Sequence, residues 1–457
     1  METPQKPPAV YFQSLTIENV RCFKGEHTID LSDGNGKPSM WTVILGNNNT
    51  GKTTLLRCLA DLEPVFAESA QTTVPDGKGG SLVFKGLYLP KTLKTITSAE
   101  RGEKYQRVLK TTAYDYTVSG DFIMRTGASY LSISQVLEKN SNMTSKDKSW
   151  AFGSKFLRGI TPDNGSQIFA NMQIYSYGVS RRASQQSLPT ELKGVVLDPF
   201  VDTIEYTNVD DWLLRLHIAK ENGEPKAFIA WNLTTQMLID AMPDARDIQV
   251  VTKPNTLESY VAVQTTMGIM PLRNLGYGYQ SAAVWLVDFA QKMLQRYGNV
   301  KDTFAQPAIV LIDELDSHLH PEWQRTIIST LSKQFPATQF IVTTHSPLLV
   351  QSFEKVNLVV LHKNTEDDSV QIEQYRQQSF QGWTVEEILR DVMRMGERTY
   401  SDKYLEVQRA FVVALENDDY TEAKRLRDEL KKMMKKDNPD IHLLDMQVSA
   451  LNGVADD

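Results

Sequence analysis

Residues 41–59 read WTVILGNNNTGKTTLLRCL, and this stretch decides the fold. Its apolar start, 41–45, is typical of a buried strand. Residues 46–53, GNNNTGKT, match the phosphate-binding P-loop pattern GxxxxGK[ST], and the residues after them have the pattern of a helix. A strand, a glycine-framed loop and a helix N-terminus together present backbone N–H groups and a positive dipole end to a polyphosphate. We therefore expect this chain to bind a nucleoside triphosphate.

Two side chains of the loop have expected roles. Lys52 should reach the β- and γ-phosphates, and the Thr53 hydroxyl should ligate Mg²⁺. A chance match in an ordinary loop is the alternative, which the flanking strand and helix disfavour. The predicted nucleotide-binding residues of the loop are Gly46, Asn47, Asn48, Asn49, Thr50, Gly51, Lys52, Thr53 and Thr54.

Two apolar runs farther along the chain end in polar residues. Residues 308–312 (AIVLI) lead into Asp313 and Glu314, a pattern typical of a central parallel strand. Asp313 is expected to hold Mg²⁺, and Glu314 is the candidate base that polarises the attacking water. Residues 339–344 lead to His345, which is placed to bind the γ-phosphate or that water. A solvated acidic turn and a structural histidine are the alternatives.

These motifs, with DELDSHLHP at 313–321 and THSP at 344–347, resemble the ABC-type ATPase head of SMC, RecF and OLD-like proteins. The resemblance covers about residues 11–62 and 270–362. It implies that Asp316 and Ser317 form a D-loop and that His345 is a switch histidine. It also implies an opening strand within 14–23 beside the nucleotide base. ATP and Mg²⁺ are then the implied ligands, and two heads would pair head-to-tail around two ATP molecules.

A head of this family also needs a signature loop, and the candidate is LGYGYQS at 275–281. Here Gly276 stands where a phosphate-contacting serine is expected, and Tyr277 replaces a glycine. Gly276 and Gly278 are still predicted to bind nucleotide, because backbone N–H groups at a helix N-terminus can bind phosphate. The departure predicts an ATPase that is slow or gated by a partner. An ordinary Gly-Tyr turn is the alternative.

The expected fold class is α/β: an ABC-type P-loop ATPase head with a mixed sheet flanked by helices, a large insertion and a helical C-terminal region. We assign the head's N-terminal part to 1–65, the remaining head strands and the insertion to 66–270, the head's C-terminal part to 271–362, and a helical region for partner binding or oligomerisation to 363–457. No sustained heptad run occurs in the insertion, so a long coiled coil is not expected. Arg181 or Arg182 is either a phosphate contact or part of a solvated surface pair.

Apolar residues in the C-terminal region recur at helical spacing in three stretches, 385–393, 404–415 and 423–433. Residues 417–419 separate the last two, which predicts a helical hairpin. Its last helix is rich in lysine and arginine. This pattern fits either a solvated basic face or a surface for DNA or an acidic partner.

The composition is that of a soluble globular protein, with 41% hydrophobic and 23% charged residues. A net charge of -7 argues against a broad nonspecific nucleic-acid coat. The two cysteines exclude a disulfide framework and fit a reducing compartment. There is no apolar run long enough to span a bilayer and no signal-peptide core near the N-terminus, so we expect a cytoplasmic protein without a membrane partner.

The residues after His345 lack the motifs of a nuclease, because neither a glutamate followed by a DxD pair nor an HNH-like group of histidines is present. The layout resembles the PtuA family, the ATPase subunits of Septu-type and retron-associated antiphage systems. This resemblance implies a partner HNH nuclease (PtuB-like), a homodimer through the ATP heads, a higher homo-oligomer, and DNA contact through the complex.

The predicted function is therefore that of an ATPase subunit that regulates this nuclease through nucleotide-dependent head dimerisation. A RecF-like DNA-repair ATPase is the alternative. The cytosolic subunit of an ABC transporter is disfavoured by the insertion and by the altered signature loop.

Overall fold

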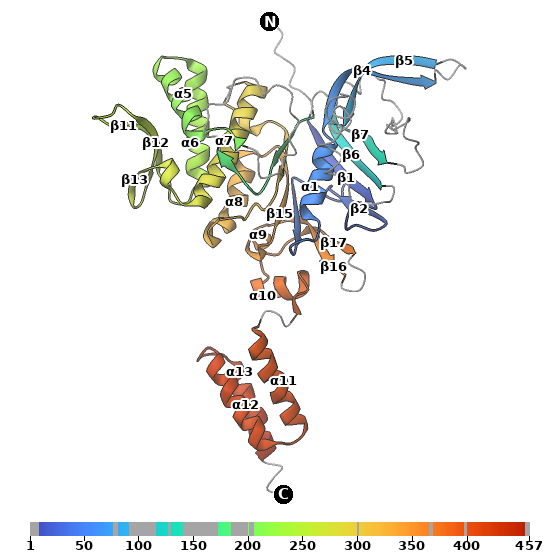
Figure 1. Cartoon of the computed structure of the whole chain (residues 1–457), viewed down its shortest axis with the longest axis vertical. Coiled ribbons are helices and arrows are strands. Elements are labelled where there is room, and N and C mark those ends of the chain that lie inside the picture. The colour runs from blue at the N-terminus through green and yellow to red at the C-terminus, as the bar shows by residue number, and fades with distance from the viewer. Residues whose placement is uncertain are drawn as a thin grey trace. The chain divides into compact units, whose positions relative to one another are not determined.

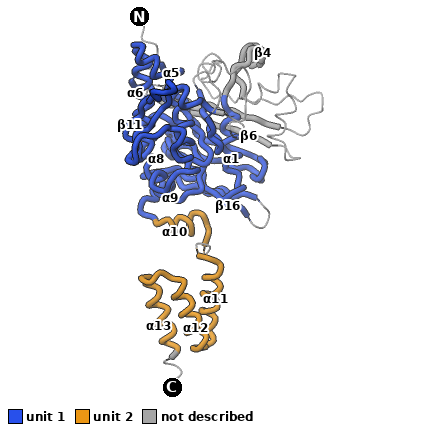
Figure 2. The backbone as a smooth tube through the Cα atoms, turned by 60° about the vertical axis from the view of Figure 1, so that its left-hand side comes forward, with its two compact units in different colours: residues 1–383 blue, residues 384–457 orange. Residues whose placement is uncertain are grey.

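The computed structural model describes residues 9–63, 172–183, 200, 205–298, 301–364, 369–396 and 400–452, and it describes four further strands within 64–139 by their backbone. The chain divides into two compact units, Met1–Trp383 and Thr384–Asp457 (Figure 2). The first unit contains the P-loop and both of the downstream apolar runs that end in polar residues. It is called the head below, and the second unit is called the tail.

A six-stranded sheet forms the centre of the head, with the order β17-β16-β3-β15-β14-β8. Its strands are β3 (Trp41–Gly46), β8 (Ile174–Tyr177), β14 (Ala308–Ile312), β15 (Thr338–Thr344), β16 (Val356–Lys363) and β17 (Val370–Gln378). All neighbours are parallel except β17, which is antiparallel to β16. Because β15 lies between β3 and β14, the carboxyl ends of these three strands meet at one edge, where ligands of open α/β sheets bind.

The other strands form smaller sheets around this centre (Figure 1). An antiparallel sheet has the order β2-β1-β6-β7, with β1 (Val10–Glu18), β2 (Glu26–Asp30), β6 (Tyr116–Thr126) and β7 (Ser129–Lys139). Strands β4 (Pro64–Pro75) and β5 (Ser81–Pro90) pair as a hairpin, and β9 (Arg182–Ala183) pairs with β10 (Glu205–Tyr206). A third group comprises β11 (Asp247–Thr252), β12 (Ser259–Thr265) and β13 (Gly268–Pro271).

Helices pack on both faces of the central sheet. The helices of the head are α1 (Lys52–Asp61), α5 (Val209–Glu221), α6 (Pro225–Ala241), α7 (Tyr277–Tyr297), α8 (Pro321–Gln334) and α9 (Pro347–Gln351), with short 3₁₀ turns at Leu272–Asn274 and Thr303–Ala305. Alternate residues of a strand face opposite sides of a sheet. Ile341 of β15 shares one core with Leu55 of α1. Its neighbour Phe340 packs against Phe335 at the end of α8, which contacts Phe289 of α7. The predicted mixed sheet flanked by helices is confirmed.

Two glutamine side chains join the central sheet to the antiparallel sheet. The buried Gln339 amide accepts from the Phe12 N–H (2.8 Å) and donates to the Phe12 carbonyl (2.9 Å). Gln374 makes the same pair of contacts with Asp30. An amide can satisfy a backbone N–H and C=O of one residue at once, because it carries both a donor and an acceptor. These polar contacts therefore fix the position of the two sheets relative to each other.

The tail contains a bundle of three helices, α11 (Asp402–Glu416), α12 (Tyr420–Met433) and α13 (Asp440–Asn452), preceded by α10 (Val385–Glu387) and a wide helical turn at Ile388–Val392. The predicted hairpin consists of α11 and α12, whereas α13 was not predicted. The buried core of the bundle consists of Val407, Phe411, Ala414, Ala423, Leu426, Leu430 and Val448. No helix in the described part of the chain is both long and apolar enough to cross a membrane.

The expectation that the chain is helical after residue 363 is wrong for residues 370–378. These residues form β17, because Val370 and Ile372 alternate with polar residues and pack into the core of the head. Three basic residues of α12 are matched by carboxylates: Arg425 binds Glu422 at 2.6 Å, Lys431 binds Asp445 at 2.6 Å, and Arg427 binds Asp428 at 2.7 Å. This pairing favours the solvated basic face over a surface for nucleic acid.

Gln339→Leu should destabilise the head, because it removes the contacts with Phe12 and leaves polar groups in an apolar core. We expect the free energy of unfolding to fall by about 1–3 kcal/mol. Urea unfolding followed by tryptophan fluorescence reports on the head alone, since all seven tryptophans lie in it. Gln371→Leu, at an exposed position of β17, is the matched control. Equal stability of the two variants would contradict the role given to Gln339.

Candidate functional site

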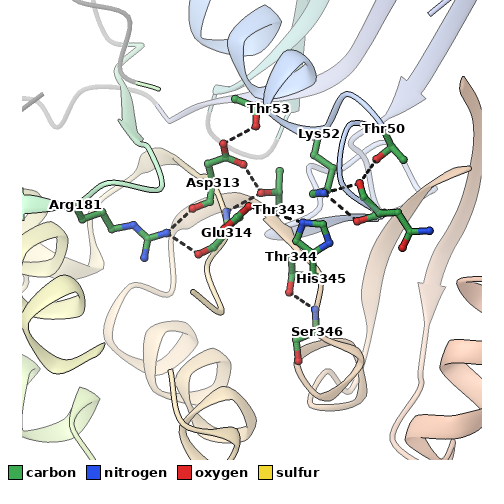
Figure 3. Close-up of polar contacts among 12 residues, drawn as sticks. Thr50, Lys52, Thr53, Arg181, Asp313, Glu314, Thr343, Thr344, His345 and Ser346 are labelled. Atoms are coloured by element: carbon green, nitrogen blue, oxygen red, sulfur yellow. Dashed lines mark hydrogen bonds and ion pairs between the residues drawn. The ribbon is translucent and has the colours of Figure 1, made fainter. Parts of the chain in front are cut away.

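The loop between β3 and α1 closes around the side chain of Lys52 (Figure 3). The Lys52 ammonium donates to the carbonyl oxygens of Gly46 (2.9 Å) and Asn47 (3.0 Å), and the Thr50 hydroxyl donates to the Asn47 carbonyl at 2.8 Å. Residues 47–49 are exposed, whereas Lys52 is buried. Burial lowers the pKa of Lys52, and nearby carboxylates, that of Asp313 first, act against this. The loop thus surrounds one positive charge with exposed backbone.

Glycine is required at two positions of this loop. A Cβ at Gly46 would lie 2.7 Å from the Thr50 hydroxyl and 3.0 Å from the Leu361 carbonyl oxygen. Gly51 has a φ of +91° and caps α1, and a Cβ there would lie 2.7 Å from both the Cys22 sulfur and the Phe23 ring. No side chain caps this end of α1, and its first turn holds no acidic residue. The N-terminal N–H groups of α1 are therefore available to an anion.

Asp313 connects the P-loop helix to two strand ends. Its carboxylate is 2% exposed and accepts from the Thr53 hydroxyl (2.6 Å) and the Thr343 hydroxyl (2.5 Å). Thr53 lies at the start of α1, and Thr343 lies near the end of β15. Residues 260 positions apart in the chain therefore meet, as predicted for Thr53 and Asp313. Sequence reasoning missed Thr343, although a threonine inside a fully buried strand signals a need for a polar partner.

Glu314 and His345 lie beside this carboxylate and face each other. The Glu314 carboxylate and the His345 ring nitrogen Nε2 are 3.8 Å apart, and the side chains are 34% and 30% exposed. The Glu314 N–H donates to the Thr343 hydroxyl at 2.7 Å. Glu314 has a φ of +48°, a left-handed conformation that costs a residue with a Cβ on the order of 1–3 kcal/mol. The two predicted catalytic residues are thus adjacent, and one of them is strained.

The environment of Arg181 differs from both environments that the sequence suggests for it. It is 3% exposed, so it is not part of a solvated surface pair, whereas Arg182 is exposed. Its guanidinium donates to the backbone carbonyls of Asp313 and Glu314 (Figure 3). Burial lowers the pKa of Arg181 to about 10, which still leaves it charged at neutral pH.

The signature-like loop lies at the N-terminus of α7. Gly276 is its N-cap residue, without a side-chain cap, and Tyr277 is 50% exposed with its ring edge-on to His318. A Cβ at Gly278 would collide with the carbonyl oxygen of His318, so α7 packs closely against the loop after β14. Within the described residues, no hydrogen bond joins 275–281 to the P-loop. The structure therefore brings the P-loop, Asp313, Glu314 and His345 together, but not Gly276 and Gly278.

The donor set next to the P-loop fits Mg²⁺. A carboxylate oxygen of Asp313 and the hydroxyl oxygen of Thr53 are already neighbours, and both are hard ligands of the kind that Mg²⁺ prefers. Mg²⁺ at nucleotide sites usually takes one or two protein oxygens, with phosphates and waters as the remaining ligands. The described residues hold no cluster of three His, Cys, Asp or Glu side chains that could bind a metal by themselves.

Two protein-family models match the head. One, described as an AAA domain, matches residues 14–149. The other, described as an AAA domain, putative AbiEii toxin, Type IV TA system, matches residues 220–351. Between them they include the P-loop, the strand that ends at Asp313, and His345.

Curated proteins with similar sequences come from two bacterial systems. The Septu protein PtuA of Bacillus thuringiensis is 34% identical over 198 residues, which are 42% of this chain and 50% of that protein. PtuA of Bacillus mycoides (strain KBAB4) is 23% identical over 365 residues, 79% of this chain and 41% of that protein. The retron Ec83 probable ATPase of Escherichia coli is 39% identical over 87 residues, 19% of this chain and 16% of that protein. The chain thus spans about half the length, or less, of these relatives.

Among solved structures, the chain is similar to an SMC head bound to the C-winged helix domain of ScpA. The TM-score is 0.47 at 13% identity, with 80% of this chain and 98% of that chain covered. The family models, together with the motifs and the sheet order, identify the head as a P-loop ATPase domain, and its sequence is similar to that of Septu protein PtuA.

The burial of His345 predicts a pH dependence of stability. Burial lowers its pKa below the ordinary 6.5, and the charge of Lys52 lowers it further, whereas Glu314, Asp316 and Asp313 act in the opposite sense. The folded head therefore binds this proton less tightly than the unfolded chain does, and the free energy of unfolding should fall as the pH drops below about 6.5. His345→Gln should reduce this fall, as measured by urea unfolding across the pH range. An unchanged slope, equal to that of the exposed control His320→Gln, would contradict the prediction.

Proposed function

We propose that this chain, whose head is a P-loop ATPase domain, hydrolyses ATP and thereby regulates a partner nuclease in an antiphage defence complex. The observation that carries the proposal is the 2.6 Å hydrogen bond between Thr53 and Asp313. It brings a P-loop and an acidic strand end into one site, although they lie far apart in the sequence. The similarity to Septu PtuA and retron ATPases supports the defence context.

ATP binding would use the groups at the start of α1. The exposed backbone of the loop and the uncapped N–H groups of α1 suit the phosphates. Lys52 now donates to two backbone carbonyls of its own loop, so its ammonium is held where a phosphate oxygen could take the place of one of them. Thr53 and Asp313 would hold Mg²⁺, which when bound neutralises charge that develops on the phosphates.

Hydrolysis would depend on Glu314 and His345. Glu314 would accept a proton from the attacking water, since its carboxylate lies at the strand end next to the Thr53–Asp313 pair and is open to solvent. His345, which faces it, would donate to the γ-phosphate or hold the water. Its lowered pKa keeps the ring neutral at pH 7, so one ring nitrogen donates while the other accepts.

A second copy of the chain would complete this site. The signature-like loop of 275–281 presents Tyr277 to solvent, and in the described part of the chain no hydrogen bond joins it to its own P-loop. Two heads arranged head-to-tail would bring the N-terminus of one α7 to the nucleotide bound by the other. Because Tyr277 and Gly276 replace the usual glycine and serine, turnover would be slow until a partner aligns the loop. Assembly of such dimers into a higher oligomer belongs to the same proposal.

The tail is our candidate surface for an HNH nuclease of the PtuB type. Its helices expose apolar side chains that a solvated bundle does not need, among them Val412 and Val413 of α11 and Leu443 and Met446 of α13. DNA would then contact the complex chiefly through the nuclease, because Arg425, Arg427 and Lys431 of α12 are already paired with carboxylates. We place the complex in the cytoplasm.

Glu314→Gln should abolish turnover while preserving ATP binding, because it removes the base and leaves the phosphate-binding groups in place. We expect a fall in kcat of at least about 100-fold and a dimer that ATP and Mg²⁺ trap, visible by light scattering. Lys52→Ala should lose both ATP binding and the dimer. Unchanged turnover of Glu314→Gln would remove this residue from catalysis, and unchanged ATP affinity of Lys52→Ala would refute the assignment of the site.

Affinity purification of the tagged chain from its native host with ATP present should recover an HNH-type nuclease in a stoichiometric amount. The same purification of Lys52→Ala tests whether the nucleotide controls the association. Recovery of the chain alone, or with replication and repair proteins, would contradict the defence proposal and favour a RecF-like ATPase.

A further inference from the structure

Arg181 is a buried charged side chain whose hydrogen bonds in the described structure go to backbone carbonyls. It lies in the turn after β8, where its Nε donates to the Gly178 carbonyl at 3.0 Å. One terminal nitrogen, Nη2, bridges two consecutive carbonyl oxygens, that of Asp313 and that of Glu314, the latter at 2.8 Å. The three acidic side chains Asp313, Glu314 and Asp316 are near enough to favour its charged form.

The two bridged carbonyls lie on either side of the Glu314 Cα atom. The Asp313 carbonyl belongs to the peptide before it, and the Glu314 carbonyl belongs to the peptide after it. The angles φ and ψ of Glu314 set the orientation of these two peptide planes relative to each other. A donor that binds both carbonyl oxygens therefore restrains both angles. The φ of +48° is a conformation that a glutamate does not favour by itself.

The N–H side of the same residue is also held. The Glu314 N–H donates to the Thr343 hydroxyl at 2.7 Å, which in turn binds the Asp313 carboxylate. With Arg181 on the carbonyl side and Thr343 on the N–H side, hydrogen bonds restrain the backbone of Glu314 on both sides of its Cα atom. The Glu314 carboxylate lies 3.8 Å from the His345 Nε2 atom.

Arg181 is itself fixed in advance. The Gly178 N–H donates to the hydroxyl of Tyr206 at 3.2 Å, which holds the turn that carries Arg181. The strand before that turn is anchored to α7, because the Tyr177 hydroxyl donates to Asp288 at 2.9 Å. The Asp313 N–H donates to the Tyr177 carbonyl at 2.8 Å. The guanidinium therefore meets the two carbonyls from a rigid support rather than from a loose loop.

We propose that Arg181 is a positioning residue for the reaction: it makes no contact with ATP, but it holds the backbone of Glu314 so that this carboxylate is aimed at the attacking water. The inference rests on the proposed function of Glu314. It distinguishes Arg181 from an arginine that binds phosphate, whose loss would weaken ATP binding, and from one that only stabilises the fold, whose loss would not depend on Glu314.

Arg181→Lys is the first test, because lysine keeps the charge but cannot bridge the two carbonyls from the same planar group. We expect kcat to fall roughly 10- to 100-fold, the loss typical of a misplaced catalytic group. The dissociation constant for ATP should change by less than about threefold. Arg215→Lys, at an exposed position of α5, should change neither quantity.

The double variant Arg181→Lys with Glu314→Gln decides between a positioning role and an independent one. If Arg181 acts through Glu314, adding Arg181→Lys to Glu314→Gln lowers the residual turnover no further. Normal turnover of Arg181→Lys, a large loss of ATP affinity, or an equal loss in both backgrounds would each overturn the proposal. Full turnover of Glu314→Gln alone would instead mean that the proposed function of Glu314 has failed.

Tyr206→Phe gives the same test with a smaller change, for the case in which Arg181→Lys does not fold. It removes the hydroxyl that accepts from the Gly178 N–H and so loosens the turn that carries Arg181, while the ring stays in place. We expect a smaller fall in kcat at unchanged ATP affinity, and no fall in the Glu314→Gln background. Turnover equal to that of the unsubstituted chain would count against the rigid support described above.

Discussion

The buried carboxylate of Asp313 is the constraint on which the rest of the site depends. A carboxylate that is 2% exposed is costly unless hydrogen bonds replace its water, and here the hydroxyls of Thr53 and Thr343 do so. These two bonds fix the start of α1 and the end of β15 relative to the end of β14. Glu314 follows Asp313 directly, and His345 follows the end of β15 directly. Both residues therefore lie at the same edge of the sheet, because each directly follows a position that these hydrogen bonds fix.

The antiparallel sheet contacts the P-loop at this edge of the central sheet. The segment between β1 and β2 carries Cys22 and Phe23, whose side chains pack where a Cβ of Gly51 would be. That segment is placed by its two strands, and the strands are placed by Gln339 and Gln374 of the central sheet. The hydrogen bonds of Gln339 and Gln374 therefore help to determine how closely α1 approaches the segment between β1 and β2, and where the N-terminal N–H groups of α1 lie. The sequence of the P-loop does not predict these bonds.

Much of the site could be predicted from sequence because its parts are local patterns. The P-loop, the apolar strand before Asp313 and the one before His345 each show in a few consecutive residues, and the order of strands in an α/β sheet then brings their ends together. Contacts between distant segments could not be predicted. The role of Arg181 depends on which carbonyls lie opposite it. Strand β17 was not predicted because its many polar residues obscure the alternation of apolar and polar positions that is typical of a strand. Helix α13 was not predicted because its apolar residues are spread around the helix, so that Leu443 and Met446 are exposed while Val448 is buried.

The left-handed backbone of Glu314 also bears on how this chain could change through mutation. Glycine adopts this conformation at little cost, and asparagine at less cost than glutamate. Selection for stability alone would therefore replace Glu314, and the thermal stability of the head would rise as its chemistry disappeared. A laboratory search for robust variants, or a consensus drawn from inactive relatives, would favour such a loss at this position. A residue that the fold holds in a costly conformation is thus one that activity would require.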